Sequence, residues 1–114
     1  MAADSLKTFA KTLTTDMTSV VDAVPTGRAG VVVYCQASNK SAAGAVTASL
    51  ELRDASQSGG SFSQVTNVSV PVGASIGMLS GKLVLNAGDT LYARASEADA
   101  CVLTVSVSYT DNAE

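Results

Sequence analysis

The feature that most constrains this chain is a strict alternation of side chains over residues 100–109. A period of two residues is typical of a β-strand with one buried and one solvated face. Residues 45–53 alternate in the same way. We therefore predict two half-buried strands. Their inward side chains are Val46, Ala48, Leu50 and Leu52, then Cys101, Leu103, Val105, Val107 and Tyr109; their outward side chains are Thr47, Ser49, Glu51 and Arg53, then Val102, Thr104, Ser106 and Ser108.

Further strands follow from apolar runs that lie between turn residues. Residues 31–37 form the most apolar run and begin with three valines, which predicts a central strand. Its expected faces are Val31, Val33 and Cys35 on one side and Val32 and Tyr34 on the other. Shorter runs predict strands over 18–24, 64–70 and 74–79. About eight strands at regular spacing indicate an all-β fold, a β-sandwich or jelly roll.

Turn chemistry divides these strands. Residues 81–95 are predicted to form a hairpin, because the Asn, Gly and Asp of residues 86–89 separate two alternating runs. Its expected inward side chains are Leu83, Leu85, Leu91, Ala93 and Ala95. Residues 24–27 and 70–73 both read Val-Pro-x-Gly, which suggests a repeated corner. The most flexible loop is expected at residues 54–61.

The first 23 residues are ambiguous. Leu6, Phe9, Leu13 and Met17 recur at helical spacing, but the many threonines between them are poor helix formers. We favour an extended arm or edge segment over 1–17, followed by a single β-sandwich domain over 18–114. These four apolar side chains are the candidate partner-binding residues. A tail without fixed structure or a self-packed edge strand is an equally good interpretation.

Composition narrows the function classes. The chain has 114 residues, enough for one domain, and aromatic residues make up only 4% of it, with no Trp. Charged residues are 15%, against about 25% in an average domain, so the surface is rich in hydroxyl groups. The seven basic residues are scattered and the net charge is −3, which argues against nucleic-acid binding. No run approaches the roughly 20 apolar residues of a membrane span, and residues 1–20 lack the apolar core of a secretory signal.

Candidate catalytic residues are few. The absence of His excludes His-based triads and most zinc sites. Cys35 and Cys101 are expected to be buried free thiols rather than a disulfide. Asp89, Glu97 and Asp99 could serve a glycosidase or bind Ca²⁺, but a turn cap and two solvated loop residues are the stronger interpretation. We expect no catalytic residues, cofactor or metal.

Three stretches resemble a family of small bacteriophage virion structural proteins, the capsid decoration (cement)-like β-sandwich proteins. They are residues 24–33, 68–75 and 81–91, which carry the two Val-Pro-x-Gly turns and a late Leu-x-Leu-x-x-Gly-Asp-x-Leu segment. The resemblance covers about residues 18–109 and implies a sandwich or jelly roll without enzymatic activity, repeated in symmetric copies.

The function expected from this resemblance is a decoration protein on the outer head surface that bridges capsid subunits. Its implied partners are the major capsid protein or other virion proteins, with a homo-oligomer, a trimer favoured, and neither nucleic acid nor membrane. Synthesis is expected in the host bacterial cytoplasm. The alternatives are a head–tail connector, a neck or tail-associated protein, and a glycan-binding fibre module.

Overall fold

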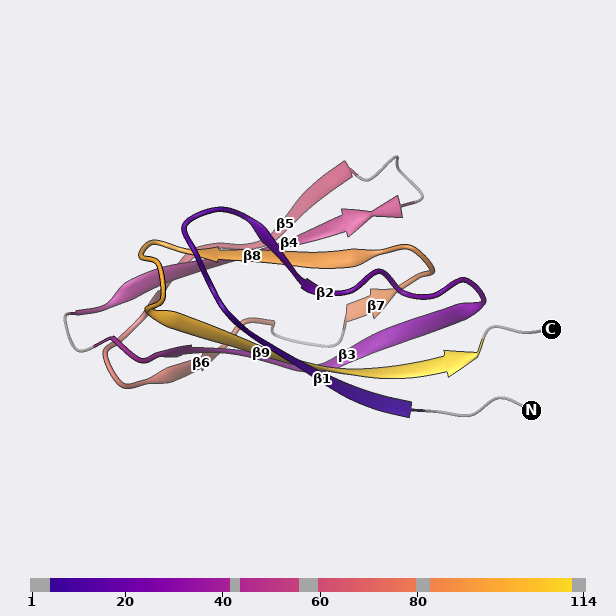
Figure 1. Ribbon diagram of the computed structural model, residues 1–114, viewed down its shortest axis with the longest axis horizontal. Coiled ribbons are helices and arrows are strands. Elements are labelled where there is room, and N and C mark those ends of the chain that lie inside the picture. Colours follow the sequence, from indigo (N-terminus) through magenta and orange to yellow (C-terminus); the bar gives the residue numbers. More distant parts are fainter. Residues whose placement is uncertain (1–4, 42–43, 56–59, 80–82, 112–114) are drawn as a thin grey trace.

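The computed structural model describes residues 5–41, 44–55, 60–79 and 83–111, and these form nine β-strands in two antiparallel sheets packed face to face (Figure 1). This confirms the predicted all-β sandwich. The first sheet has the order β1 (Ser5–Thr12), β9 (Cys101–Asp111), β3 (Arg28–Asn39), with β6 (Ser75–Gly77) and β7 (Leu83–Leu85) both on the far edge of β3. The second sheet has the order β2 (Thr18–Val21), β8 (Thr90–Ala95), β4 (Val46–Asp54), β5 (Gly60–Val70).

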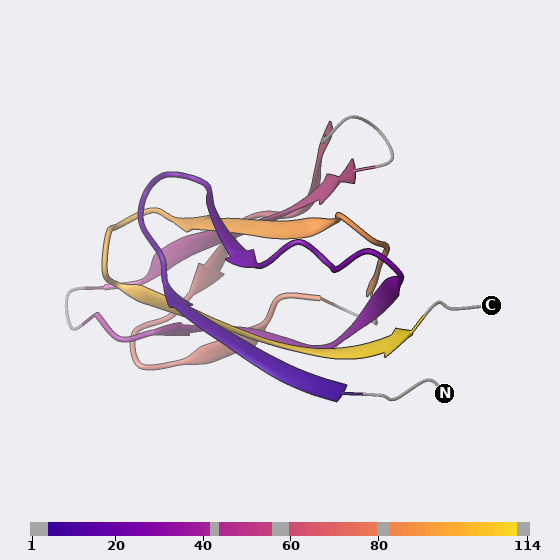
Figure 2. The same cartoon turned by 45° about the vertical axis from the view of Figure 1, so that its right-hand side comes forward.

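The strand pairs are nested along the chain. β1 pairs with β9, β2 with β8, β3 with β6 and β7, and β4 with β5. If β6 and β7 are taken as one interrupted strand, this is an eight-stranded jelly roll, in which a long antiparallel ribbon folds over into two sheets. Figure 2 shows the two layers from a second angle, with β1 and β9 in one and β2 and β8 in the other.

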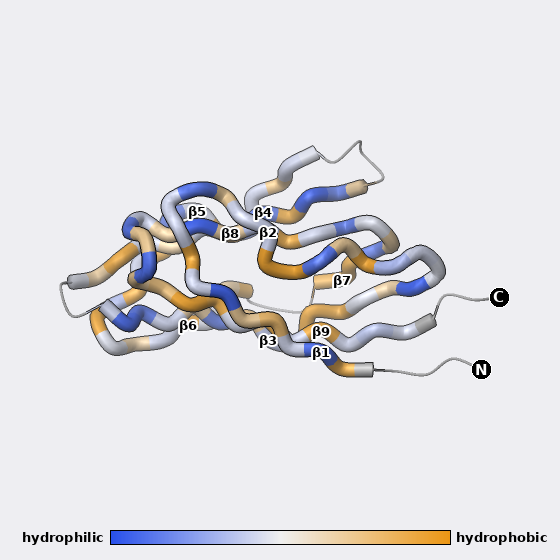
Figure 3. The backbone as a smooth tube through the Cα atoms, viewed as in Figure 1, coloured by the Kyte–Doolittle hydropathy of each residue, from blue (hydrophilic) through white to orange (hydrophobic). Residues whose placement is uncertain are grey.

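The core lies between the sheets and is aliphatic. Apolar residues are spread along the strands of both sheets (Figure 3). All five inward side chains predicted for residues 100–109 are buried, as are Val46, Ala48 and Leu50. Each fully buried Leu or Val stabilises the fold by roughly 1.5–3 kcal/mol. The largest of the fully buried side chains are Leu13, Leu50, Leu85, Leu91 and Leu103.

The predicted hairpin over residues 81–95 is wrong in its pairing. β7 pairs with β3 in the first sheet, whereas β8 pairs with β2 and β4 in the second. The turn itself is confirmed, since the amide of Asp89 donates to the carbonyl of Asn86 at 2.9 Å. This turn therefore passes the chain from one sheet to the other. Alternation shows which side chains face the core and contains no information about which strand lies alongside.

A β-bulge in β3 overturns the faces predicted for residues 31–37. The register against β9 shifts between Val32 and Tyr34, so Val33 is an extra residue. Val32 and Cys35 are both buried, whereas Val33 and Tyr34 are both exposed. A bulge places two residues opposite one on the partner strand, and the alternation changes phase there.

The other predicted strands are confirmed, with shifts at their ends. β2, β4 and β5 cover most of residues 18–24, 45–53 and 64–70, and β6 covers half of residues 74–79. The two Val-Pro-x-Gly corners also match each other. The carbonyls of Pro25 and Pro71 each accept from the amide three residues on, at 3.1 Å, around Gly27 and Gly73 with φ of 84° and 71°. Half of the loop expected at 54–61, residues 56–59, lies outside the described residues, and Asp54, Gly60 and Ser61 belong to β4 and β5.

Residues 5–12 of the N-terminal segment form a strand and not a helix. β1 pairs with β9 along its whole length, from Ser5 opposite Tyr109 to Thr12 opposite Val102. It forms an edge of the first sheet. No helix long and apolar enough to cross a membrane occurs among the described residues.

Candidate interaction surface

The first sheet presents a broad outward surface, which we call the outer face. Residues directly opposite on antiparallel strands point to the same side, so the register defines its members. The outer face comprises Leu6, Thr8, Ala10 and Thr12 on β1, Val102, Thr104, Ser106, Ser108 and Thr110 on β9, Ala29, Val31, Tyr34, Gln36 and Ser38 on β3, Ser75 and Gly77 on β6, and Val84 on β7.

None of these residues is charged. Their polar groups are largely hydroxyls, and two pairs of these bond to each other. In one pair, Thr8 Oγ1 lies 3.1 Å from Ser106 Oγ. A second row runs across β3 and β6, where the Tyr34 hydroxyl donates to Gln36 Oε1, Gln36 Nε2 donates to Ser38 Oγ at 3.2 Å, and Ser38 Oγ lies 3.0 Å from Ser75 Oγ. Groups already bonded within the face lose less solvation when a partner covers them.

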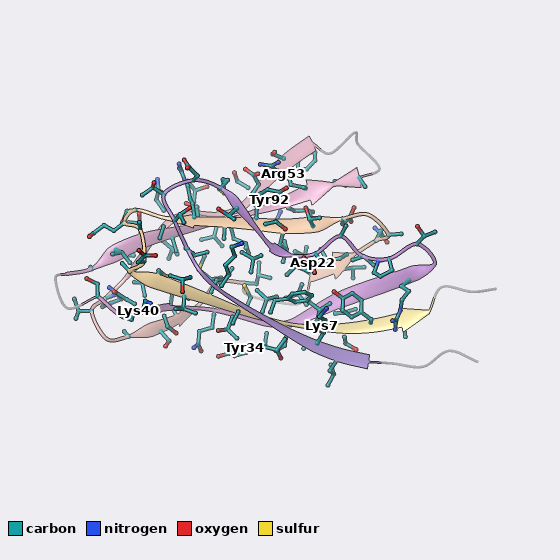
Figure 4. The ribbon with its side chains drawn as sticks, viewed as in Figure 1. Lys7, Asp22, Tyr34, Lys40, Arg53 and Tyr92 are labelled. Carbon is teal, nitrogen blue, oxygen red and sulfur yellow. The ribbon has the colours of Figure 1, made fainter. Side chains whose placement is uncertain are left out.

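Apolar side chains stand among these hydroxyls. Leu6 is 75% exposed, Val84 is 55% exposed and Tyr34 is 45% exposed. An exposed aromatic residue within an uncharged surface is typical of the anchor residues of protein interfaces. Figure 4 shows Tyr34 on the side of the first sheet that points away from the second sheet.

The corresponding surface of the second sheet has a different chemistry. Glu51, Arg53 and Arg94 point outward there, opposite Tyr92, Thr90 and Ser49 respectively. Arg53 Nε lies 2.5 Å from Glu51 Oε1, and the Arg53 guanidinium stacks 4.0 Å from the Tyr92 ring (Figure 4). Among the described residues, the charges on the outward surfaces of the two sheets therefore lie on the second.

Ser49, predicted to face solvent, is only 3% exposed. Asn67 covers it: the Asn67 amide donates to Ser49 Oγ at 2.8 Å, and Ser49 Oγ donates to Asn67 Oδ1 at 3.2 Å. Asn67 has φ of 50° and lies where the β4–β5 register shifts between Ala48 and Leu50. The bulge brings the Asn67 side chain over β4.

The sheet edges carry features that oppose pairing with a second copy of this chain. β2, β6 and β7 are only 4, 3 and 3 residues long, and the register of β5 against β4 shifts twice. β1 carries Lys7 and Lys11 at inward positions, opposite Val107 and Leu103. Short strands, bulges and inward-pointing lysines are the devices by which natural sheets avoid edge-to-edge aggregation. The outer face is the larger surface on which a folded partner could dock.

The four candidate partner-binding residues do not share a surface. Leu6 lies on the outer face and Phe9 on the inward side of β1, opposite Val105. Leu13 is fully buried in the core, where its amide donates to the Cys101 carbonyl at 2.8 Å. Met17 is half-buried between β1 and β2. That these residues bind a partner stays a prediction, and only Leu6 belongs to the outer face.

The three candidate carboxylates are also dispersed. Asp89 is 2% exposed, and its Oδ1 and Oδ2 accept from the amides of Ala55 and Asn86, each at 2.9 Å. Glu97 and Asp99 are exposed in the loop after β8, at the opposite end of that strand. The turn-capping interpretation of Asp89 is confirmed. Within the described residues, no group of three or more Cys, Asp or Glu side chains could hold a metal ion.

Both cysteines are buried free thiols, as expected. Cys35 lies opposite Val105 and Cys101 opposite Asn39, four positions apart along β3. Burial raises the pKa of the Cys35 thiol to about 12. Burial also raises the pKa of Cys101, and a hydrogen bond with the Ser38 backbone opposes that rise. Neither thiol is set up as a nucleophile.

No family model and no curated protein sequence matches the chain. Several solved structures are nevertheless similar to it in fold. The capsid of Helicobacter pylori bacteriophage KHP30 matches with a TM-score of 0.56 and 14% identity, over 99% of this chain and 95% of that chain. At this identity the likeness is one of fold.

Two further structures share the fold. Bacillus endospore appendages, described as disulfide-linked pili, match with a TM-score of 0.56 and 11% identity, over 99% of this chain and 89% of theirs. The VLP of the extra small virus of the giant freshwater prawn Macrobrachium rosenbergii matches with a TM-score of 0.51 and 12% identity, over 99% and 81%. At these identities, too, the likeness is one of fold.

Sequence reasoning missed the outer face as a unit. Its members come from five strands that span residues 6–110, and their adjacency exists only after folding. One signal was present: every outward position from 102 to 108 is uncharged, whereas residues 51 and 53 are charged outward positions. Comparing the two strands would have singled out β9.

Proposed function

We propose that this chain is a virion structural protein, specifically a capsid decoration (cement) protein that binds the outer head surface and bridges capsid subunits. The observation that carries the proposal is the uncharged, hydroxyl-bearing outer face. The jelly-roll fold, shared with capsid structures of a bacteriophage and of the prawn virus, supports the same setting. The partners are the major capsid protein or other virion proteins.

The outer face suits a contact that is repeated many times. β3, β9 and β1 are 12, 11 and 8 residues long, and β9 pairs with both of the others, so the face is a stiff surface that orders few residues on binding. Its hydroxyls need no counter-charge on the partner. A rigid, nearly neutral surface costs less conformational entropy and less desolvation than a flexible or charged one.

Stabilisation of the shell follows from linkage. A protein that binds the assembled lattice and not the free subunits stabilises the lattice by mass action. If the decoration protein is itself a symmetric oligomer, with a trimer favoured, several contacts form together and the overall affinity exceeds that of one face. In this role the fold provides a binding surface, and no reaction is required of it.

The test is to locate and count the chain in particles of the virus that encodes it, by cryo-EM and by quantitative gel. We expect hundreds of copies on the outer head, with the outer face against the shell or against a neighbouring copy. Six or twelve copies at the portal vertex would instead make it a neck or head–tail connector protein. Saturable binding on a glycan array, with the chain at a fibre tip, would replace the proposal by a glycan-binding module.

A further inference from the structure

A groove of about 510 Å³ opens between β1 and the segment that connects β2 to β3. Phe9, Pro25 and Tyr109 supply apolar lining, and Lys7, Asp22 and Arg28 supply charge. Lys7 and Asp22 come from the two sides of this gap, from β1 and from the residue that follows β2 (Figure 4). The groove lies on the inward side of β1, and Leu6, at the end of the outer face, also lines it.

The free edge of β1 runs beside this groove. β1 pairs with β9 on one side, and no strand among the described residues pairs with its other side. Lys7, Phe9 and Lys11 point inward along this edge, because they lie opposite Val107, Val105 and Leu103. A strand added here would place every second side chain against this row and toward the groove.

The groove contains two opposite charges, Asp22 and Arg28, whereas the edge of β1 carries two lysines, Lys7 and Lys11. Asp22 and Arg28 act on the same group: burial raises the pKa of Tyr109, Asp22 adds to the rise and Arg28 opposes it. Arg28 also lies over the Tyr109 ring, with its guanidinium carbon 5.5 Å from the ring centre. Lys7 and Lys11 are exposed, and neither forms an ion pair with a carboxylate whose position is described. Lys7 lies over the Phe9 ring, with its Nζ 5.0 Å from the ring centre. The edge thus presents cation, aromatic ring, cation at alternate positions.

We propose that the free edge of β1 binds, by strand addition, an extended segment of another protein that carries an acidic, an apolar and an acidic side chain at alternate positions. The acidic side chains pair with Lys7 and Lys11, and the apolar one packs on Phe9 beside the groove. Main-chain hydrogen bonds to the edge supply affinity, and the alternate side chains supply specificity. This site is independent of the proposed virion role.

A second copy of the chain is a poor occupant of the same edge. In an antiparallel two-fold pair centred on Phe9, Lys7 of one copy lies opposite Lys11 of the other. Like charges directly opposite across a strand pair are destabilising. The two lysines therefore oppose self-pairing and favour an acidic partner. Repulsion between lysines of two copies in this way contributes to specificity.

The probe is a labelled heptapeptide, Thr-Glu-Thr-Val-Thr-Glu-Thr, whose symmetry makes its direction irrelevant. The full chain is titrated with it, and backbone amide shifts are followed by NMR with fluorescence anisotropy for affinity. We expect saturable binding with the largest shifts along residues 5–12, weakening as salt is added. The matched peptide with Lys in place of both Glu residues should bind at least about tenfold more weakly.

The protein variants complete the test. Lys7→Glu with Lys11→Glu should reverse the preference, so that the lysine peptide binds more tightly than the glutamate peptide. Lys40→Glu with Arg94→Glu, which makes the same change of net charge at exposed positions away from β1, should preserve the original preference. Circular dichroism shows whether each variant folds. The comparison of the two peptides on the unmodified chain tests the proposal even if a variant does not fold. Equal binding of both peptides, no saturable binding up to about 1 mM peptide, or shifts confined to the outer face would each overturn the proposal.

Discussion

Asp89 Oδ1 accepts a hydrogen bond from the backbone amide of Ala55 at 2.9 Å, across 34 positions of sequence. The same carboxylate accepts from the Asn86 amide through Oδ2, also at 2.9 Å. A buried turn residue thus joins the corner between β7 and β8, where the chain changes sheets, to the end of β4 in the second sheet.

Replacing Asp89 should be costly for this reason. Asp89→Ala leaves two amides without their acceptor, and we expect a loss of roughly 2–4 kcal/mol in the free energy of unfolding, measured by urea denaturation. Asp89→Asn keeps one acceptor oxygen and should cost about half as much. Asp99→Asn, at an exposed position, should change stability by less than about 0.5 kcal/mol. Equal losses at the two aspartates would show that the Asp89–Ala55 bond does not hold this corner.

Gly88 and Gly73 form a second matched pair. Both have positive φ, 88° and 71°, but a Cβ on Gly88 would lie 2.8 Å from Ala55 Cβ, whereas a Cβ on Gly73 would meet nothing within 4 Å. Gly73→Ala should therefore lower the free energy of unfolding only by the cost of a positive φ, about 1–2 kcal/mol. Gly88→Ala should lose roughly 1–3 kcal/mol more through the clash. Thermal melts of the two variants give the order, and a larger loss at Gly73 would contradict the packing of the corner.

The Cys35 thiol predicts how stability depends on pH. Its pKa is about 12 in the folded chain, above its ordinary value of 9.0, so the buried neutral thiol contributes fully below pH 9 and that contribution is lost as pH rises toward 12. Between pH 8 and pH 10.5 the loss due to this group is about 2 kcal/mol. Cys35→Ala removes the titration, and its free energy of unfolding should fall less over that range than that of the unmodified chain. Parallel curves for the two proteins would be inconsistent with a desolvated Cys35.

The outer face can be tested by adding one charge at its centre. Ser106 lies between Thr8 and Tyr34 in register, so Ser106→Lys places an ammonium where a docked partner would exclude water. If the face is the contact with the shell, binding to particles that lack this protein should weaken at least about thirtyfold. The measurement is co-sedimentation over a range of concentrations.

Ser63→Lys is the matched control, because Ser63 is exposed on the second sheet opposite Glu51. It should leave binding unchanged. A loss of binding in Ser63→Lys alone would move the contact to the second sheet.

Local physics made much of the fold predictable. The alternation of residues 100–109 gave the buried side chains of β9 correctly, and the Asn, Gly and Asp of residues 86–89 gave a real turn. Each depends on neighbours in the sequence. The side predicted for Val33 was wrong because the bulge depends on the pairing of β3 with β9. The hydrophobic pattern of one strand does not reveal an extra residue relative to the partner strand.

The candidate surface was less predictable than the fold. The helical spacing of Leu6, Phe9, Leu13 and Met17 suggested one apolar stripe, but an extended backbone sends them to different places. The outer face was missed because no single strand contains it. The inward lysines of β1 were overlooked because their meaning depends on β1 being an edge.

The sequence by itself determined the secondary structure of this protein, the turn residues and the aliphatic core, since these follow from side-chain size, polarity and backbone preference over a few neighbours. Only the tertiary structure decided that β7 and β8 belong to different sheets, that β1 is an edge, and that the uncharged strands lie side by side. The physical reason is that strand pairing brings together residues as far apart as Thr8 and Ser106, and no local preference encodes that choice.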